Sequence, residues 1–205
     1  MAIQFDLTKD KSAAPIAFAL SKVQAFIVEL YWESKHDLDA HAIALANHRY
    51  TSADDILSTY NPNMVLLDDR SKNHTVGGNN AFTNQANSLV HMGDKRTGLG
   101  VNARDPDEVL RVNLSNLGGR DEVGFFVTMH PPCTAKFSDV DSAKLVIKDD
   151  TGAELLVANL THDFDAYDMV QMGSIVKNAA TGAWDFNPVA NGVNGTFNDI
   201  LAAFA

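Results

Sequence analysis

Residues 24–32 read Gln-Ala-Phe-Ile-Val-Glu-Leu-Tyr-Trp, and this stretch indicates the fold class. Phe26, Val28, Leu30 and Trp32 alternate with residues of mixed polarity, which is the period of two expected of a β-strand. Because all four are large and apolar, their face of the strand is expected to be fully buried. The stretch therefore predicts a strand in a mostly buried setting.

Seven further stretches carry strand signals and are separated by Gly, Asn and Asp residues. One of them, residues 37–45, alternates in the same way but gathers its polar residues at its start. Asp149-Asp150-Thr151-Gly152 reads as a hairpin turn between two others. The remaining strands are predicted at residues 109–114, 122–129, 144–148, 154–160, 169–176 and 184–189.

Helix signals are few and short. The C-terminal stretch places Phe197, Ile200, Leu201 and Phe204 on one helical face, with Thr196 as N-cap. Residues 52–55 resemble a capping box and predict one helical turn toward Tyr60. Many short strands with few helices predict an all-β fold, an antiparallel β-sandwich with a few short helices and an amphipathic C-terminal helix. We expect a single domain over residues 1–205, with an Asn- and Gly-rich surface loop from about residue 61 to residue 81.

The overall charge limits the partners. The chain has 205 residues, with 16 Lys and Arg against 26 Asp and Glu, a net charge of −10. This negative field repels phosphate backbones and anionic lipids, so nucleic acid is not expected as a partner. No apolar run approaches the roughly 20 residues of a membrane span, so no integral membrane association is expected. Residues 13–20 have the length of a signal-peptide core, but acidic residues precede them and we expect no export by that route.

Acidic residues gather around one glycine-rich stretch. Residues 93–100 read Gly-Asp-Lys-Arg-Thr-Gly-Leu-Gly, and Asp107-Glu108 follow at the start of a predicted strand. Glycines permit tight turns, and carboxylates spaced through such turns can converge on a hard cation. Glu108 shares a strand face with Leu110 and Val112, so unless the strand end is open to water its carboxylate needs a buried partner.

Asp37 and Asp39 pose the same problem, because they share a strand face with Ile43 and Leu45. Two strand ends that carry acids could therefore meet over one ion. An alternative assigns ordinary roles to these residues: the aspartates are turn formers or lie in a solvated loop (Asp37, Asp39, Asp94, Asp105, Asp107), and Glu108 pairs with Arg96, Arg104 or Arg111. Sequence spacing alone leaves both interpretations open.

Motifs for catalysis are weak. His130-Pro131-Pro132-Cys133 offers a histidine and a cysteine but no evident third orienting group. The chain has neither a phosphate-binding glycine loop followed by Lys nor a Gly-x-Ser-x-Gly elbow, and its histidines lack zinc-site spacing. His36 and His41 flank the acidic pair, where they either sense its charge or, for His41, donate a hydrogen bond. We expect the protein not to be an enzyme.

The succession of motifs resembles the TerD family of tellurium-resistance and stress proteins. The resemblance rests first on Asp-Leu-Asp-Ala at residues 37–40 and on the glycine-rich stretch with its approach, residues 82–98. It continues through Asp107-Glu108, Val112-Asn113-Leu114 and the tryptophan turn at residues 182–186. It covers nearly the whole chain except residues 49–81, which look like an insertion.

The resemblance implies a β-sandwich that binds Ca²⁺ through acidic loops at one end. The positions that match the family's ligands are Asp37, Asp39, Asn84, Asp94, Asp107 and Glu108. Two departures oppose this: Lys95 stands where the family usually has Asn, and residues 101–106 replace a glycine and aspartate run. Because Lys95 and Arg104 place positive charge near the ion, they favour weak binding or the loss of one ion site of a pair.

Two functions follow as expectations. The leading one is a non-enzymatic, Ca²⁺-binding scaffold or binding module of a bacterial or phage stress or defence system, located in the cytoplasm and acting on protein partners or copies of itself. Its acidic loops would become ordered when an ion binds. The alternative is a structural or decoration component of a phage virion or another large assembly, which the insertion and the altered acidic loop favour.

Overall fold

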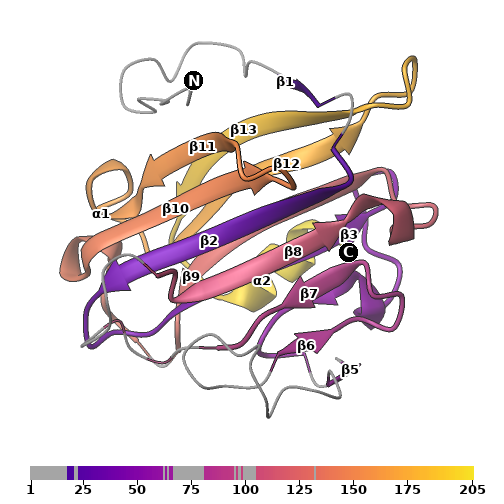
Figure 1. The fold of residues 1–205 in the computed structure, drawn as a ribbon. Coiled ribbons are helices and arrows are strands. Elements are labelled where there is room, and N and C mark those ends of the chain that lie inside the picture. The colour runs from indigo at the N-terminus through magenta and orange to yellow at the C-terminus, as the bar shows by residue number, and fades with distance from the viewer. Residues whose placement is uncertain are drawn as a thin grey trace.

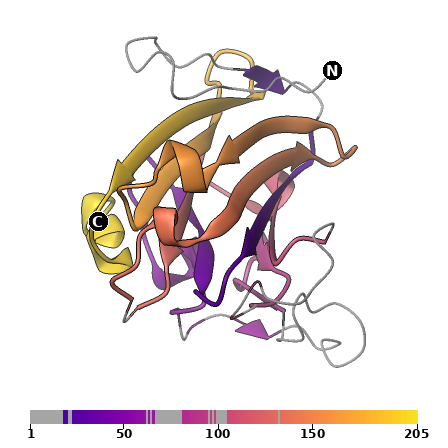
Figure 2. The ribbon, with the colours of Figure 1, turned by 90° about the vertical axis from the view of Figure 1, so that its left-hand side faces the viewer.

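A computed structural model describes residues 18–20, 23–61, 63, 65–66, 81–94, 96, 98, 105–131 and 133–205. Two antiparallel sheets lie face to face, as Figures 1 and 2 show. The structure therefore confirms the predicted all-β sandwich with few short helices.

The six-stranded sheet has the order β1-β13-β12-β9-β3-β4. Its strands are β1 (Phe18–Leu20), β13 (Trp184–Val193), β12 (Met169–Lys177), β9 (Glu122–Met129), β3 (Leu38–Leu45) and β4 (Ile56–Leu57). The seven-stranded sheet has the order β11-β10-β2-β8-β7-β6-β5. Its strands are β11 (Glu154–Asn159), β10 (Asp141–Asp149), β2 (Ala25–Glu33), β8 (Glu108–Asn113), β7 (Leu89–His91), β6 (Phe82–Thr83) and β5 (Val65–Leu66).

The core fills the space between the sheets. On β2, Phe26, Val28, Leu30 and Trp32 are buried while the intervening side chains are half-buried, which confirms the alternation seen in the sequence. They join apolar residues of the facing sheet, among them Phe125 and Phe186, in one large cluster. Burial of this apolar surface is the main stabilising force.

Both faces of strand β3 are buried. Leu38, Ala40, Ala42 and Ala44 face the core between the sheets. Ile43 and Leu45 face the other way and pack against helix α2 (Phe197–Ala203), which lies on the outside of the six-stranded sheet. Thr196 is the N-cap of this helix, as predicted.

The predicted strands agree with the observed ones within a few residues, with two differences at helical turns. The turn that begins after Ser52 is a 3-10 helix limited to Ala53–Asp55, because the next two residues join β3 as β4 instead of continuing toward Tyr60. The strand predicted to reach residue 160 ends at Asn159, whose side chain caps α1 (Leu160–Asp163). Two further 3-10 helices span Leu114–Asn116 and Phe137–Asp139.

Most of the predicted Asn- and Gly-rich loop, residues 67–80, lies outside the described residues. Within the described ranges, no helix is both long enough and apolar enough to cross a bilayer.

Candidate metal centre

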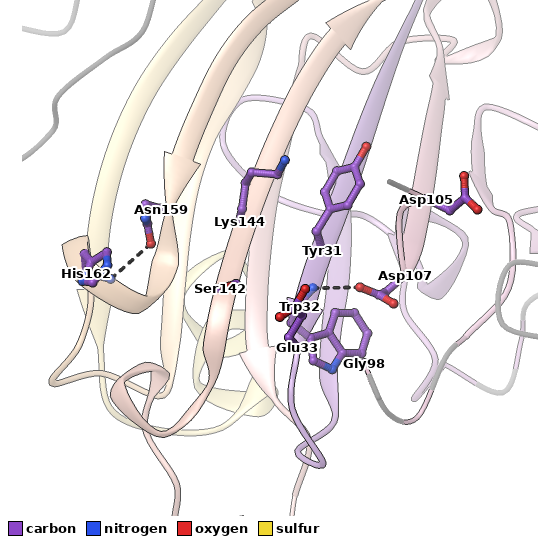
Figure 3. Close-up of a pocket in the computed structure, with 10 residues that line it drawn as sticks. All are labelled: Tyr31, Trp32, Glu33, Gly98, Asp105, Asp107, Ser142, Lys144, Asn159 and His162. Carbon is purple, nitrogen blue, oxygen red and sulfur yellow. Dashed lines mark hydrogen bonds between the residues drawn. The ribbon is translucent and has the colours of Figure 1, made fainter. Parts of the chain in front are cut away.

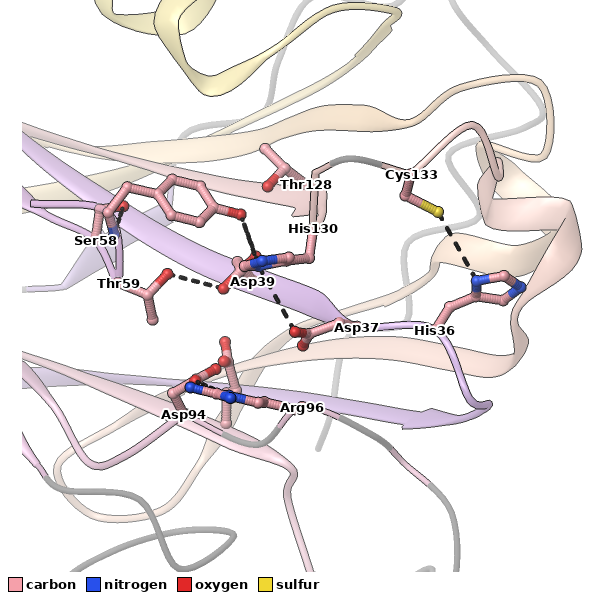
Figure 4. Close-up of polar contacts among 12 residues, drawn as sticks. His36, Asp37, Asp39, Ser58, Thr59, Asp94, Arg96, Thr128, His130 and Cys133 are labelled. Carbon is pink, nitrogen blue, oxygen red and sulfur yellow. Dashed lines mark hydrogen bonds and ion pairs between the residues drawn. The ribbon is translucent and has the colours of Figure 1, made fainter.

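Four carboxylates meet at one end of the sandwich because strand ends bring them there. Glu108 opens β8, and β8 runs antiparallel to β7, so Asp94, three residues after β7, returns to the same end. Asp37 and Asp39 lie at the start of β3 in the facing sheet. Figure 4 shows Asp37, Asp39 and Asp94 turned toward a common region.

The inner group consists of Asp39, Asp94 and Glu108. One ligand oxygen from each lies within 4.8 Å of the others. The Glu108 side chain is 0% exposed. Its Oε2 accepts a hydrogen bond of 2.7 Å from the Ala40 backbone N–H, whereas no described donor reaches its buried Oε1. A buried carboxylate oxygen without a donor is costly unless a cation or a proton compensates it.

Burial, and after it mutual repulsion, raises the pKa values of the clustered acids. Burial, with the Asp39 charge as the next cause, raises the pKa of Glu108 well above its usual value. The same two causes raise the pKa of Asp94. Burial followed by the charges of Asp39 and Asp94 raises the pKa of Asp37 to about 7. The folded chain therefore holds these acids in a state that favours a bound proton or a bound cation.

The outer group consists of Asp37, Asp39 and His130. His130 Nδ1 lies 2.9 Å from Asp39 Oδ2 and 3.6 Å from Asp37 Oδ2. His130 follows β9, which pairs with β3, and its backbone N–H donates to the Asp37 carbonyl oxygen. Strand pairing thus places a histidine beside the two aspartates.

Two hydroxyl groups cap Asp39 from the segment that follows β4. Thr59 Oγ1 donates to Asp39 Oδ1 over 2.8 Å, and the Tyr60 hydroxyl donates to Oδ2. The Asp39 side chain is consequently only 1% exposed. Burial, followed by the Asp39 charge and hydrogen bond, raises the pKa of Tyr60, so this phenol remains a donor.

The donor set suits a hard divalent cation. Ca²⁺ and Mg²⁺ prefer carboxylate oxygens, and Ca²⁺ tolerates irregular arrangements completed by water. Glu108 has a buried oxygen without a donor, Oε1, and belongs to a group with Asp39 and Asp94; this combination is the structural feature that such an ion fits. Asp39, Asp94 and Glu108 would hold it.

Two of the six candidate ligands, Asn84 and Asp107, belong to neither acidic group and accept hydrogen bonds from the backbone. Asn84 Oδ1 accepts hydrogen bonds from the backbone N–H groups of Ser88 and Leu89, and its amide donates to Ser88 Oγ. Asn84 therefore stabilises the turn between β6 and β7. Asp107 Oδ2 accepts a 2.7 Å bond from the Trp32 N–H, so it ties the loop before β8 to β2.

Asp107 and Glu108 face opposite ways, as neighbours on a strand do. Asp107 lines a shallow hollow of about 300 Å³ on the outer side of the seven-stranded sheet, with Asp105, Lys144 and Tyr31 (Figure 3). Lys144 Nζ lies 4.3 Å from the centre of the Tyr31 ring. The hollow mixes charges of both signs and lacks the converging carboxylates of the inner group.

The alternative interpretation, in which the acids have ordinary roles, fails at two of the described residues. Asp39 is buried rather than solvated, and Arg111 donates to Asn113 rather than to Glu108. Arg96 Nε lies 3.8 Å from Asp94 and its side chain is 80% exposed. Lys95 and residues 101–104, the predicted departures from the family pattern, lie outside the described residues.

The sequence interpretation missed Thr59, Tyr60 and His130. Thr59 and Tyr60 lie in the stretch assigned to an insertion, where no periodicity points inward. His130 could have been found only from the pairing of β3 with β9, which places it beside Asp37. His130 and Cys133 together make a weak catalytic motif in the sequence. In the structure, the Cys133 sulfur lies 3.8 Å from His36 Nδ1.

The fold and the site define a two-sheet β-sandwich protein with a carboxylate cluster at one end. The TerD domain family model matches residues 3–204, and the chain belongs to that family. No curated protein matches the sequence.

Two solved structures share the fold. One is a homologue of the telluride resistance protein TerD, SCO6318 from Streptomyces coelicolor A3(2). It has a TM-score of 0.65 and 20% identity over 89% of this chain and 96% of that one. The other is SAV2460, a protein of unknown function, with a TM-score of 0.68 and 14% identity over 89% of this chain and 98% of that one.

Proposed function

We propose that this TerD-family protein is a non-enzymatic Ca²⁺-binding module that acts as a binding or scaffold protein through ion-ordered acidic loops. The observation that carries the proposal is Glu108: a fully buried carboxylate with one donor-free oxygen beside two other acids. The family supports a role in stress response or defence, with protein partners.

The mechanism follows from charge. Without an ion, ionised Asp39, Asp94 and Glu108 repel one another at short range in a poorly solvated site. A dication neutralises them and fixes their relative positions. Because Asp94 and Glu108 lie at the two sides of the loop between β7 and β8, the ion ties together both ends of that loop. The ordered loop then offers a defined surface to a protein partner.

Isothermal titration of chelator-stripped protein tests the proposal, with Ca²⁺ and Mg²⁺ in parallel. We expect Ca²⁺ to bind and Glu108→Gln or Asp94→Asn to weaken binding by roughly tenfold or more, since each removes a charged ligand. Glu154→Gln is the matched control: it makes the same charge change at an exposed position on β11, outside both acidic groups. Binding that is unaffected by Glu108→Gln, or no Ca²⁺ heat with the unaltered chain, would refute the proposal.

A further inference from the structure

His91 is a buried histidine beside the inner acidic group. One ring nitrogen lies near Glu108, and the other bonds to the backbone of the residue before Asp94. It ends β7, is 0% exposed, and stacks on Phe82 with ring centroids 4.6 Å apart. Its Nδ1 accepts a 3.2 Å hydrogen bond from the Gly93 N–H, directly before Asp94. Its Nε2 lies 3.6 Å from Glu108 Oε2 and has no hydrogen-bond partner among the described residues.

These contacts fix the tautomer of the ring. Nδ1 accepts the Gly93 N–H, so this nitrogen carries no proton and the ring is a neutral imidazole. A neutral imidazole carries one proton, and Nδ1 is occupied as an acceptor. Nε2 therefore carries the proton and directs an N–H dipole toward the Glu108 carboxylate.

We propose that His91 is the positioning residue of the cation site, acting on Glu108 through Nε2–H and on Asp94 through the Gly93 backbone. The inference rests on the proposed cation binding. The His91 Nε2–H and the Ala40 N–H both point to Glu108 Oε2, so that Oε1 is left for the ion. The Nδ1 acceptor fixes the turn at Gly93, whose φ of 127° is in a region that favours glycine.

The role differs from ordinary core packing in what it predicts. A packing residue affects the stability of the cation-free fold, whereas a positioning residue affects the affinity for the cation. His91→Phe keeps a flat ring against Phe82 but removes both polar atoms, including a buried nitrogen without a partner. Because the buried Gly93 N–H then loses its acceptor, we expect the melting midpoint in chelator to fall, but only by the contribution of about one hydrogen bond.

Calcium titration of the full chain provides the test, with His91→Phe, His91→Gln and His91→Asn compared. We expect His91→Phe to raise the calcium Kd by roughly tenfold to a hundredfold, the range for partners that orient metal ligands. Gln keeps an N–H donor near the Nε2 position and Asn keeps an acceptor near the Nδ1 position. Each should restore part of the lost affinity.

The outcomes separate the two proposals. If the unaltered chain gives no calcium signal, the proposed function fails. If the unaltered chain binds calcium and His91→Phe binds it equally well, the function stands and the role of His91 is overturned. Should His91→Phe not fold, unchanged Kd values for both His91→Gln and His91→Asn would overturn the role, and weaker binding by either would support it.

Discussion

At the scale of single residues, the surroundings of Glu108 are unfavourable for an ionised carboxylate when no cation is bound. Removing an ionised carboxylate from water costs several kcal/mol unless charge or hydrogen bonds compensate. Glu108 has one backbone donor, a neutral histidine and two acids as neighbours. A stable fold tolerates such a group because either a proton or a dication compensates its charge. Because the two compete, the site responds both to pH and to the cation.

Gly98 lies in close contact with the end of β2. Its N–H donates to the Ser34 carbonyl oxygen over 3.0 Å, and an added Cβ would clash with the Trp32 carbonyl oxygen. We predict that Gly98→Ala lowers the free energy of unfolding by about 1–3 kcal/mol, since the backbone must move apart. Gly119→Ala is the control, because its Cβ would meet nothing within 4 Å. Equal urea denaturation curves for both variants would contradict this role of Gly98.

The hydroxyl of Tyr60 is predicted to stabilise the buried charge of Asp39. Tyr60→Phe keeps the ring beside Phe197 but removes the donor, and hydrogen bonds to charged groups contribute about 1.5–3 kcal/mol. We expect chemical denaturation in chelator to show that Tyr60→Phe lowers the free energy of unfolding by about 1.5–3 kcal/mol. A variant as stable as the unaltered chain would mean that the hydroxyl contributes little to the cap on Asp39.

At the scale of elements, β3 and α2 link the site to the outer face of the molecule. Asp39 and His41 lie on the same side of β3 as Ile43, and the His41 ring lies 4.2 Å from that of Phe197 on α2. Burial lowers the pKa of His41 to about 4, so this contact is between uncharged rings. The helix therefore closes the face of β3 that carries Asp39.

Ile200 anchors this helix, and its truncation measures how much the helix contributes. Ile200 is buried against β3 and β9, whereas Asn198 on the same helix is exposed. We predict that Ile200→Ala lowers the unfolding free energy by about 2–4 kcal/mol, as large-to-small core substitutions do. Asn198→Ala should change it little. The pair is to be compared by thermal and urea denaturation, and similar values for the two would show that the packing of Ile200 contributes little to stability.

The longer strands were predictable because each has enough residues for the alternation of apolar and polar side chains to be visible. Strand β9 has the bounds that the sequence indicates, Glu122–Met129. Strands of two or three residues, such as β4, β6 and β7, carry too few positions for a period to show. Their positions are fixed by pairing with longer neighbours.

At the scale of the whole molecule, the site depends on strand order. The alternation along the strand placed Glu108 on the face of Leu110 and Val112 and so predicted a buried carboxylate, unless the strand end was open to water. The structure shows that Glu108 is buried. Parity could not show that β3 and β8, in different sheets, bring Asp39 and Glu108 together, because pairing and sheet order are not local properties. The positions of His130 and Tyr60 beside Asp39 were hidden for the same reason.

The raised pKa values of the clustered carboxyl groups predict how stability depends on pH. A carboxyl with a raised pKa binds more protons when folded, so its stabilising effect at acid pH is lost as the pH rises through the folded value. For Asp37 that value is about 7, and the pKa shifts of Asp94 and Glu108 have the same sign. His41 and His91 act oppositely, but only below their unfolded pKa of 6.5.

The acidic groups alone therefore decide the trend above that value. We predict that the melting midpoint in chelator falls between pH 6.5 and about pH 8. Saturating calcium should remove this fall, because bound cations keep the carboxylates ionised in the folded state. Parallel melts in chelator and calcium across that range provide the measurement. A midpoint that rises with pH in chelator would conflict with the raised pKa values of these carboxyl groups.

The most direct measurement is a crystal structure of the chain grown with calcium. The account predicts one calcium ion with oxygen ligands from Asp39, Asp94 and Glu108, and with Glu108 Oε1 as its ligand atom. An electron-density map at saturating calcium that shows these three side chains without an ion between them, or an ion held elsewhere, would contradict it.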